Sequence, residues 1–269
     1  MSAFGTLKAA RLLADAHQSG HRLQGLPCEL APADMEQGYA IQFATAVVRG
    51  SGAAAFKIGL TNTKAQQALG AVEPIAGQLT RRDLLPSASR IATPRHHLRV
   101  VEAEIVFEIG KDLSPAQAPF SESVVIDSIA AAYAGLEICD SRFSNGDELS
   151  LAHLVADNSN ADVLVVGEPI ADWSAASLAD LPVMLTLGDH PTIQGSTARV
   201  LGNPVRSAVW LANWLAARGE TLRRGQLISS GSCTDIAEAA QGDRVLAIFG
   251  AGSSASAEFL ASAEQPEVQ

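Results

Sequence analysis

The feature that most constrains the fold is the succession of short apolar runs that begins after Gly70. Each run has the length and the Val- and Ile-rich composition of a β-strand, and Gly, Pro, Asp or Asn separates it from the next. The runs occupy residues 99–110, 161–169, 181–189, 226–231, 244–250 and 253–259. Two segments between them have helical patterns: Ser121–Tyr133, and a helix with Asn203 as N-cap, Pro204 at its first position and Gly219 at its end. Strands without regular βα alternation predict an α+β protein with a mixed or largely antiparallel sheet, and argue against a doubly wound parallel sheet.

The first 70 residues differ from this strand-rich part. Apolar residues spaced four apart predict a helix over 35–47, and residues 7–14 belong to another. Residues 54–60 predict a short strand, and residues 63–70 a short helix with Gly70 at its C-cap. We therefore expect a mainly helical N-terminal region, residues 1–70, and a strand-rich catalytic domain, residues 71–269.

Composition excludes several classes of protein. With 47% hydrophobic residues the chain can bury a large core, and a net charge of −10 opposes nonspecific binding to nucleic acid or to an anionic membrane. Its three scattered cysteines form no disulfide framework or zinc ribbon, which favours a reducing compartment. Lys8, Arg11 and Asp15 interrupt the N-terminal apolar residues, so no signal-peptide core is expected. We expect a cytoplasmic protein.

Acidic residues on one predicted strand give the first chemical signal. Because strand side chains alternate between faces, Glu102 and Glu104 project side by side. Two close carboxylates repel unless one stays protonated or a cation lies between them, and a hard divalent ion suits oxygen ligands. A bare E-x-E is more often a solvated polar face of an edge strand, and Glu108, further along, is assigned to solvent.

Two further charged residues lie in apolar surroundings. Glu137 stands in a run that predicts a buried strand, where it serves either as a third metal-binding carboxylate or in a salt bridge with an Arg. Asp140 and Arg142 are close enough in sequence to pair with each other. Lys57 lies between Phe56 and Ile58, and an apolar wall or a nearby metal would lower its pKa; a surface Lys with a buried stem is the alternative.

Two other patterns have simpler interpretations. The G-x-G-x-x-A at 250–255 lacks the long βαβ unit of a dinucleotide site and predicts a β-hairpin turn. Trp210 and Trp214 lie one turn apart on the predicted helix that follows Asn203. An exposed aromatic stripe usually marks a protein contact, so it predicts a homo-oligomer.

Seven motifs occur in an order that resembles the 2-keto-4-pentenoate hydratase family of the fumarylacetoacetate-hydrolase-like superfamily. They are KIGLTN at 57–62, EPIAG at 73–77, VEAEI at 101–105, GLEICDSR at 135–142, VADN at 155–158, LGNP with WLA at 201–212, and GDRV at 242–245. The resemblance runs from about residue 35 to residue 260. The 4-oxalocrotonate decarboxylases are a sister branch that shares nearly all of these motifs.

This resemblance implies a helical N-terminal part packed on a mixed β-roll. It implies Mg²⁺ or Mn²⁺ held by Glu102, Glu104 and Glu137, with Lys57 as the active-site lysine. Residues implied to contact or enclose the substrate are Ser159, Asn160, Ser230 and Gly231. The implied reaction is hydration of a 2-hydroxy-2,4-dienoate to a 4-hydroxy-2-oxo acid, in aromatic or related catabolism, with no organic cofactor.

Three departures from the family pattern leave alternatives open. Ile75 stands where hydratases commonly have an Asp thought to move protons with the lysine, whereas the decarboxylase branch often has an apolar residue there. Val100 replaces a frequent Arg, and Asn160 a frequent Ser. A 4-oxalocrotonate-type decarboxylase is therefore the alternative function, and a non-catalytic partner subunit is a third.

Overall fold

A long antiparallel pair of strands, β5 and β6, forms the middle of the larger of two sheets. The structure, a computed structural model, describes residues 2–50, 52–92, 97–144 and 149–260, so residues 261–269 of the predicted catalytic domain lie outside the described residues. The helices are α1 (Ala3–Ser19), α2 (Met35–Val48), α3 (Thr63–Leu69), α4 (Glu122–Ile126), α5 (Leu151–Ala156) and α6 (Pro204–Ala217). The strands are β1 (Ala55–Gly59), β2 (Ile75–Leu79), β3 (Leu84–Pro86), β4 (Ser89–Ile91), β5 (Val100–Ile109), β6 (Ile129–Cys139), β7 (Ala161–Pro169), β8 (Pro182–Leu187), β9 (Ile193–Ser196), β10 (Leu227–Ser232), β11 (Ala237–Glu238), β12 (Arg244–Phe249) and β13 (Ser253–Phe259).

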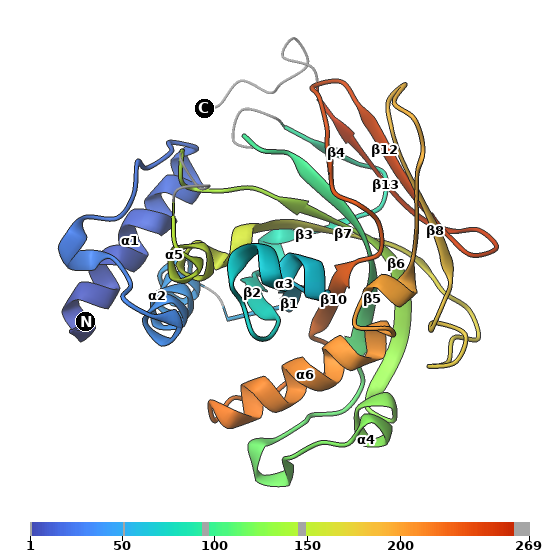
Figure 1. Cartoon of the computed structure of the whole chain (residues 1–269), viewed down its shortest axis with the longest axis horizontal. Coiled ribbons are helices and arrows are strands. Elements are labelled where there is room, and N and C mark those ends of the chain that lie inside the picture. The colour runs from blue at the N-terminus through green and yellow to red at the C-terminus, as the bar shows by residue number, and fades with distance from the viewer. Residues whose placement is uncertain (1, 51, 93–96, 145–148, 261–269) are drawn as a thin grey trace.

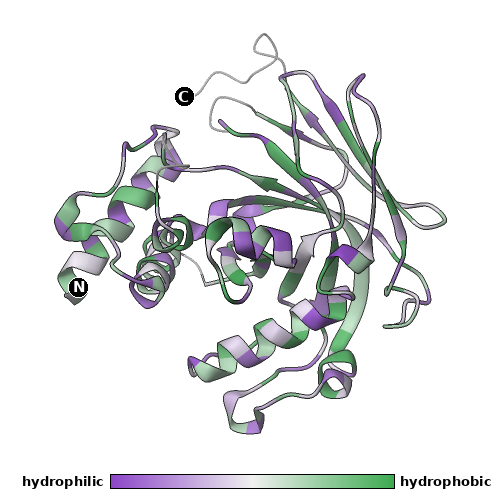
Figure 2. Cartoon of the chain, in the orientation of Figure 1, coloured by the Kyte–Doolittle hydropathy of each residue, from purple (hydrophilic) through white to green (hydrophobic). Residues whose placement is uncertain are grey.

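The larger sheet is mixed, as the strand pattern predicts. Its order is β2-β1-β10-β5-β6-β7-β3, with β11 beside β5, and the β1–β10 and β3–β7 pairs are parallel. A second sheet, β4-β13-β12-β8-β9, packs through β12 and β13 against β6 and β7. Figure 1 shows the larger sheet curled beside this second sheet, with α1, α2 and α5 gathered at one side. Hydrophobic and hydrophilic residues are interspersed along the β12–β13 hairpin (Figure 2), whose inward side chains join the main core.

The predicted strands are all present, and the 250–255 turn does join β12 to β13 in an antiparallel hairpin. Helix α6 has Asn203 as its N-cap, whose side chain accepts a hydrogen bond from the backbone N–H of Val205. Strand β1 belongs to the larger sheet although it lies within residues 1–70. The division into two regions at residue 70 stays a prediction.

One predicted helix is wrong over half its length. Helix α4 starts as expected after Ser121 but ends at Ile126, and residues from Ile129 onward form β6 instead. The alanine-rich sequence favours a helix locally, but the same residues pair with β5 from Ile109 to Val100. Tertiary pairing along a whole strand outweighs the few tenths of a kcal/mol per residue that helix propensity supplies.

The two tryptophans of α6 do not form an exposed stripe. Trp214 is buried, and its ring packs against Tyr39, with ring centroids 4.6 Å apart, and against Trp210 at 5.8 Å. Trp210 is half-buried, and its indole N–H donates to Glu73. Because these rings pack within the chain, they give no support for self-association. The homo-oligomer stays a prediction from the family resemblance, and a monomeric mass in light scattering would contradict it.

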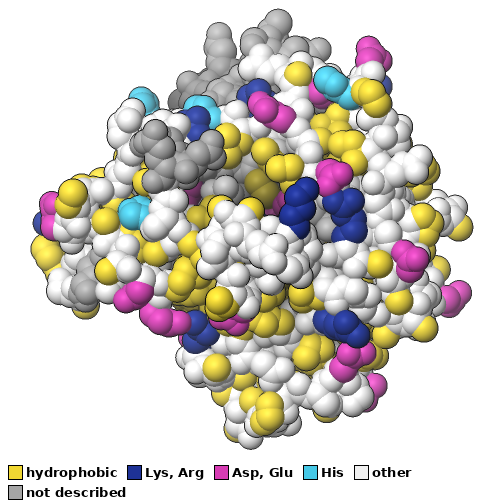
Figure 3. Space-filling model, in the orientation of Figure 1, with side chains coloured by type: hydrophobic (Ala, Val, Ile, Leu, Met, Phe, Trp, Pro, Cys, Tyr) yellow, Lys and Arg dark blue, Asp and Glu magenta, His cyan; other side chains and the backbone are white. Residues whose placement is uncertain are grey.

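Charged side chains of both signs are spread over the visible face of the molecule, and Lys and Arg side chains stand beside a hollow near its middle (Figure 3).

A polar cavity of about 560 Å³ lies between α1, the end of α2 and the segment that follows β6. His17 lines this cavity with its Nε2 2.8 Å from Arg49 Nη2 and its Nδ1 3.5 Å from Asp162 Oδ1. Burial lowers the pKa of His17 to about 4, and the charge of Arg142 acts in the same direction. His17 is therefore neutral at pH 7, with Nε2 placed to accept from Arg49.

We expect stability to fall on mild acidification because of His17. Its folded-state pKa lies below its unfolded value, so the unfolded chain binds more protons between about pH 6.5 and pH 4. His17 should thus cost about 1–2 kcal/mol of unfolding free energy between pH 7 and pH 5. Urea unfolding of His17→Gln should show a correspondingly flatter pH dependence, whereas His21→Gln, at an exposed position, should behave like wild type. Parallel pH profiles for wild type and His17→Gln would contradict the assignment.

Candidate active site

Pairing of β5 with β6 brings the acidic residues together. Glu102 lies directly opposite Glu137, and Glu104 lies opposite Gly135. Because side chains alternate along each strand, Glu102, Glu104, Glu137 and Cys139 all share one face of the sheet. Glu104 and Glu137 are fully buried, which excludes a solvated polar face as the interpretation of the E-x-E sequence. Glu108 is only half-buried and accepts a hydrogen bond of 2.7 Å from the hydroxyl of Tyr133.

Strand β10 supports one oxygen of Glu104. The Ser229 hydroxyl donates to Glu104 Oε2 at 2.6 Å, and the backbone N–H of Gly231 donates to the same oxygen at 2.9 Å. Within the described part of the chain, the other oxygen, Oε1, receives no hydrogen bond. Burial and the charges of Glu137 and Glu102 raise the pKa of Glu104 well above its usual value. Glu104 is therefore held in one orientation with a free, buried acceptor.

Lys57 of β1 faces Glu137, so the alternative of a Glu137–Arg bridge is wrong. Lys57 Nζ lies 3.2 Å from Glu137 Oε1, and both side chains are almost completely buried. Neither oxygen of Glu137 has a hydrogen-bond partner among the described residues, so this contact is an ion pair without hydrogen-bond geometry. A buried carboxylate in this state retains unused lone pairs, which is costly unless another group satisfies them.

The pKa of Lys57 is shifted upward, so the downward shift expected from its apolar surroundings is wrong, whereas the expected effect of a nearby metal stays a prediction. Burial does act to lower the pKa of Lys57, but Glu137 raises it, as do Cys139, Glu102 and Glu104, and the net shift is upward. The ammonium is therefore charged at neutral pH. Gly77 on β2 leaves space for the Lys57 side chain. Any larger residue there would be crowded, because its Cβ would lie 3.1 Å from Lys57 Cγ and 2.4 Å from the carbonyl oxygen of Asn158.

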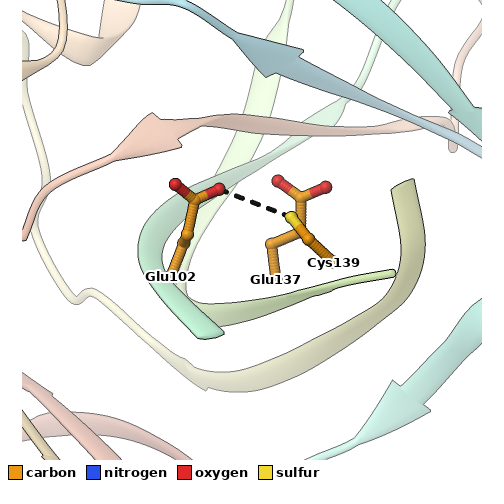
Figure 4. Close-up of side chains that lie close together, drawn as sticks. All are labelled: Glu102, Glu137 and Cys139. Atoms are coloured by element: carbon orange, nitrogen blue, oxygen red, sulfur yellow. Dashed lines mark hydrogen bonds between the residues drawn. The ribbon is translucent and has the colours of Figure 1, made fainter. Parts of the chain in front are cut away.

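Glu102, Glu137 and Cys139 form a cluster of possible metal ligands among the described residues. One ligand atom from each lies within 4.8 Å of the others, and Figure 4 shows the three side chains projecting together from adjacent strands. The Cys139 thiol donates to Glu102 Oε2 at 3.6 Å. Burial, followed by the charge of Glu137, raises the pKa of Glu102 and of Cys139. Glu104 is not a member of this cluster, although its charge interacts with both glutamates.

The charged residues of the site fit a divalent cation. The carboxylates of Glu102, Glu104 and Glu137 and the Lys57 ammonium carry a net charge of −2 when all four are ionised. Two of the carboxylates are fully buried with oxygens that receive no hydrogen bond in the described structure. Oxygen-rich, anionic donor sets of this kind suit Mg²⁺ or Mn²⁺. A cation would relieve the repulsion that raises the pKa values of Glu102 and Glu104.

The residues predicted to contact substrate lie in two places. Ser159 is buried, and its hydroxyl donates to the carbonyl of Ala76 at 2.8 Å, which ties the 159–160 segment to β2. Asn160 is half-buried, and its carbonyl accepts from the backbone N–H of Asp140. Gly231 supports Glu104, whereas the buried hydroxyl of Ser230 has no hydrogen-bond partner among the described residues. Their role in substrate binding stays a prediction.

Ile75 does lie beside the lysine. It is buried on β2. Ile75 and the Lys57 ammonium both lie against Gly59: a Cβ built on that glycine would lie 3.3 Å from Ile75 Cγ1 and 3.7 Å from Lys57 Nζ. Ile75 and Gly77 are two residues apart on β2, so Ile75 shares the face on which Lys57 projects. An apolar wall therefore adjoins the ammonium at this point.

The pairing of Asp140 with Arg142 is not the main contact of either residue. Arg142 Nε lies 2.5 Å from Asp157 Oδ1, and both groups are buried. Asp140 instead accepts hydrogen bonds from the backbone N–H groups of His97 and Leu98. Asp157 lies far enough along the chain that only the fold brings it to Arg142.

Sequence reasoning missed Ser229 and Cys139 as parts of the site. Ser229 precedes the predicted Ser230, and the alternation of side chains turns it toward Glu104. Cys139 follows Glu137 by two residues, so its position on the same face was available from strand periodicity.

Comparison with known proteins identifies sequence relatives and proteins of similar fold. A scan against models of protein families finds no match. A 2-keto-4-pentenoate hydratase of Paraburkholderia xenovorans (strain LB400) is 32% identical over 239 residues, 88% of either chain. The structure of 4-oxalocrotonate decarboxylase from Pseudomonas putida G7, complexed with magnesium and adipate, matches with a TM-score of 0.87 and 25% identity over 97% of this chain and 99% of that one. Fumarylpyruvate hydrolase from Pseudomonas aeruginosa, in complex with Mn²⁺ and pyruvate, has a TM-score of 0.60 at 13% identity and covers 77% of this chain and 88% of its own.

The curled mixed sheet is the fold of the fumarylacetoacetate hydrolase superfamily, which confirms the predicted fold class. Within that class, the extent of the sequence match shows that the chain belongs to the 2-keto-4-pentenoate hydratase family.

We expect the carboxylates to be required for divalent-metal binding. Removing two anionic ligands in Glu102→Gln, Glu104→Gln should weaken Mn²⁺ affinity by at least about ten-fold, since loss even of groups that orient ligands costs that much. Isothermal titration with Mn²⁺ measures the affinity, and Glu108→Gln is the matched control on the same strand. Equal affinity of wild type and the double variant would refute the assignment of these two glutamates.

Proposed function

We propose that this protein is a metal-dependent hydro-lyase that converts 2-hydroxy-2,4-dienoates of the 2-keto-4-pentenoate type to 4-hydroxy-2-oxo acids. The observation that carries the proposal is the buried ion pair of Lys57 with Glu137 beside Glu102 and Glu104. The relative that is 32% identical over 88% of this chain is named as a hydratase of this kind. A small anionic substrate would fit this site once a divalent cation offsets the net charge of −2, beside the charged ammonium of Lys57.

Glu102, Glu104 and Glu137 would hold Mg²⁺ or Mn²⁺, with Cys139 adjacent. When bound, such an ion supplies a positive charge that stabilises an oxygen anion of the substrate. Ser229 and the backbone N–H of Gly231 keep Glu104 oriented by binding only one of its oxygens. No organic cofactor is part of this proposal.

Lys57 would supply the proton or the cationic contact that the reaction needs. Conversion of the dienol to an enone removes the C2 hydroxyl proton and adds a proton at C5, after which water adds its hydroxyl to C4 and a proton to C3. A lysine kept protonated by Glu137 is suited to donate a proton or to bind the substrate carboxylate. It is not suited to act as a base until the charge around it changes.

Decarboxylation of a 4-oxalocrotonate-type 2-oxo acid is the second candidate, and Ile75 favours it. This buried apolar side chain adjoins Gly59 and the region of the Lys57 ammonium. An apolar wall keeps a departing carboxylate poorly solvated, which favours release of CO₂. It also cannot exchange protons, as an Asp at this position would. A non-catalytic partner subunit is disfavoured because burying four ionisable groups without a chemical use is destabilising.

Product analysis with a substrate panel tests the function. We expect hydration of 2-hydroxypenta-2,4-dienoate in the presence of Mg²⁺, loss of activity with chelator, and a fall of about 10²–10⁴-fold in Lys57→Met. 4-Oxalocrotonate is assayed in parallel for CO₂ release. Absence of hydration with release of CO₂ would establish the second candidate, and absence of both would refute an enzyme of this class.

Ile75→Asp separates the two reactions within the same panel. The new carboxylate adds polarity where a departing carboxylate would lie, so any decarboxylation should fall more than any hydration. Ile75→Val keeps the wall apolar and is the matched control. Equal losses of the two activities in Ile75→Asp would show that Ile75 only packs.

Location and assembly complete the proposal. None of the helices that the structure describes is long and apolar enough to cross a membrane. A cytoplasmic location, a homo-oligomeric state and the absence of nucleic-acid or membrane partners remain predictions from the sequence.

A further inference from the structure

Cys139 occupies a position that the proposed hydratase function does not use. It ends β6, two residues after Glu137, and is a buried, free cysteine. Its sulfur faces the same space as the carboxylates of Glu102 and Glu137 (Figure 4). The other two cysteines of the chain, Cys28 and Cys233, are not members of this cluster.

The separation of sulfur and oxygen matches the edge of a coordination polyhedron. Cys139 Sγ lies 3.6 Å from Glu102 Oε2. Zinc bonds of about 2.3 Å to sulfur and about 2.0–2.2 Å to oxygen, at a tetrahedral angle, place the two ligand atoms about 3.5–3.7 Å apart. A thiol–carboxylate hydrogen bond gives the same distance, so geometry alone allows both arrangements.

Glu137 supplies an independent sign that a ligand belongs between these groups. It is fully buried, and neither of its oxygens receives a hydrogen bond from the described residues. Its ion pair with Lys57 places Oε1 3.2 Å from the lysine Nζ. A buried carboxylate with an unused oxygen, aimed at a second carboxylate and a thiol, is a ready-made site for a cation.

We propose that Cys139 is a metal ligand and that it gives this site selectivity for thiophilic divalent cations such as Co²⁺, Zn²⁺ and Cd²⁺. The inference rests on the proposed metal site of Glu102, Glu104 and Glu137 and deepens it. A thiophilic ion is bound by Glu102, Glu137 and the Cys139 thiolate, and the thiol proton is released to solvent on binding. Mg²⁺ and Mn²⁺, which prefer oxygen, use the carboxylates and leave the thiol protonated.

The test uses the full-length, metal-stripped chain and Co²⁺ as a spectroscopic probe. We expect Co²⁺ to produce a thiolate-to-cobalt charge-transfer band in the near ultraviolet in wild type. The band should persist in Cys28→Ser and Cys233→Ala and disappear in Cys139→Ser, which keeps a hydrogen-bond donor but removes sulfur. Cd²⁺ affinity should fall at least about ten-fold in Cys139→Ser, while Mn²⁺ affinity changes less than about two-fold.

Unchanged Mn²⁺ binding by Cys139→Ser also shows that this variant is folded. X-ray absorption of the zinc-loaded wild type gives a reading that needs no variant: one sulfur neighbour at about 2.3 Å is expected. Co²⁺ binding without the band, or zinc without a sulfur neighbour, would overturn the role of Cys139 and leave the carboxylate site intact. A band that survives in Cys139→Ser would also overturn it, and failure of wild type to bind any of these ions would refute the proposed metal site itself.

Discussion

The antiparallel pairing of β5 with β6 is the constraint on which the site depends. It sets Glu102 opposite Glu137 and buries Glu104 in the middle of the larger sheet. Transferring a carboxylate from water to such a place costs several kcal/mol unless charges and hydrogen bonds compensate. Lys57 on β1 and the two donors of β10 offset only part of that cost, because several carboxylate oxygens receive no hydrogen bond in the described structure.

This incomplete compensation connects stability with function. The fold contributes one cation for three anions, and burial, together with the remaining negative charge, raises the pKa values of Glu102 and Glu104. The rest of the molecule packs around these charges: strands β12 and β13 pack on β6 and β7, and α6 packs on β10. The same uncompensated charge that disfavours folding is what would bind a divalent ion tightly.

Much of the fold and part of the site follow from local sequence patterns. Period-two alternation placed Glu102 and Glu104 on one face, and the N-cap at Asn203 with Pro204 located α6. The prediction of a helix for the alanine-rich segment after Ile126 is wrong because its strand partners lie 20 to 39 residues earlier in the chain. The predicted direction of the Lys57 pKa shift is wrong for a similar reason. The apolar neighbours of Lys57 are adjacent in sequence, whereas Glu137, which contributes most to the upward shift, is brought to Lys57 by the pairing of strands in the sheet.

The hydrogen bonds that Glu104 receives from β10 show why such contacts cannot be predicted from local sequence patterns. The β5–β10 register shifts between Ser229 and Ser232, and within this irregularity Gly231 has a φ of +114°. A side chain at Gly231 would be strained in this conformation and would also meet Thr61, because a Cβ there would lie 2.3 Å from the Thr61 hydroxyl oxygen. The irregularity lets Ser229 and the N–H of Gly231 donate to the same oxygen of Glu104. Because both donors converge on Oε2, the other oxygen of Glu104 receives no hydrogen bond in the described structure and is available to a cation.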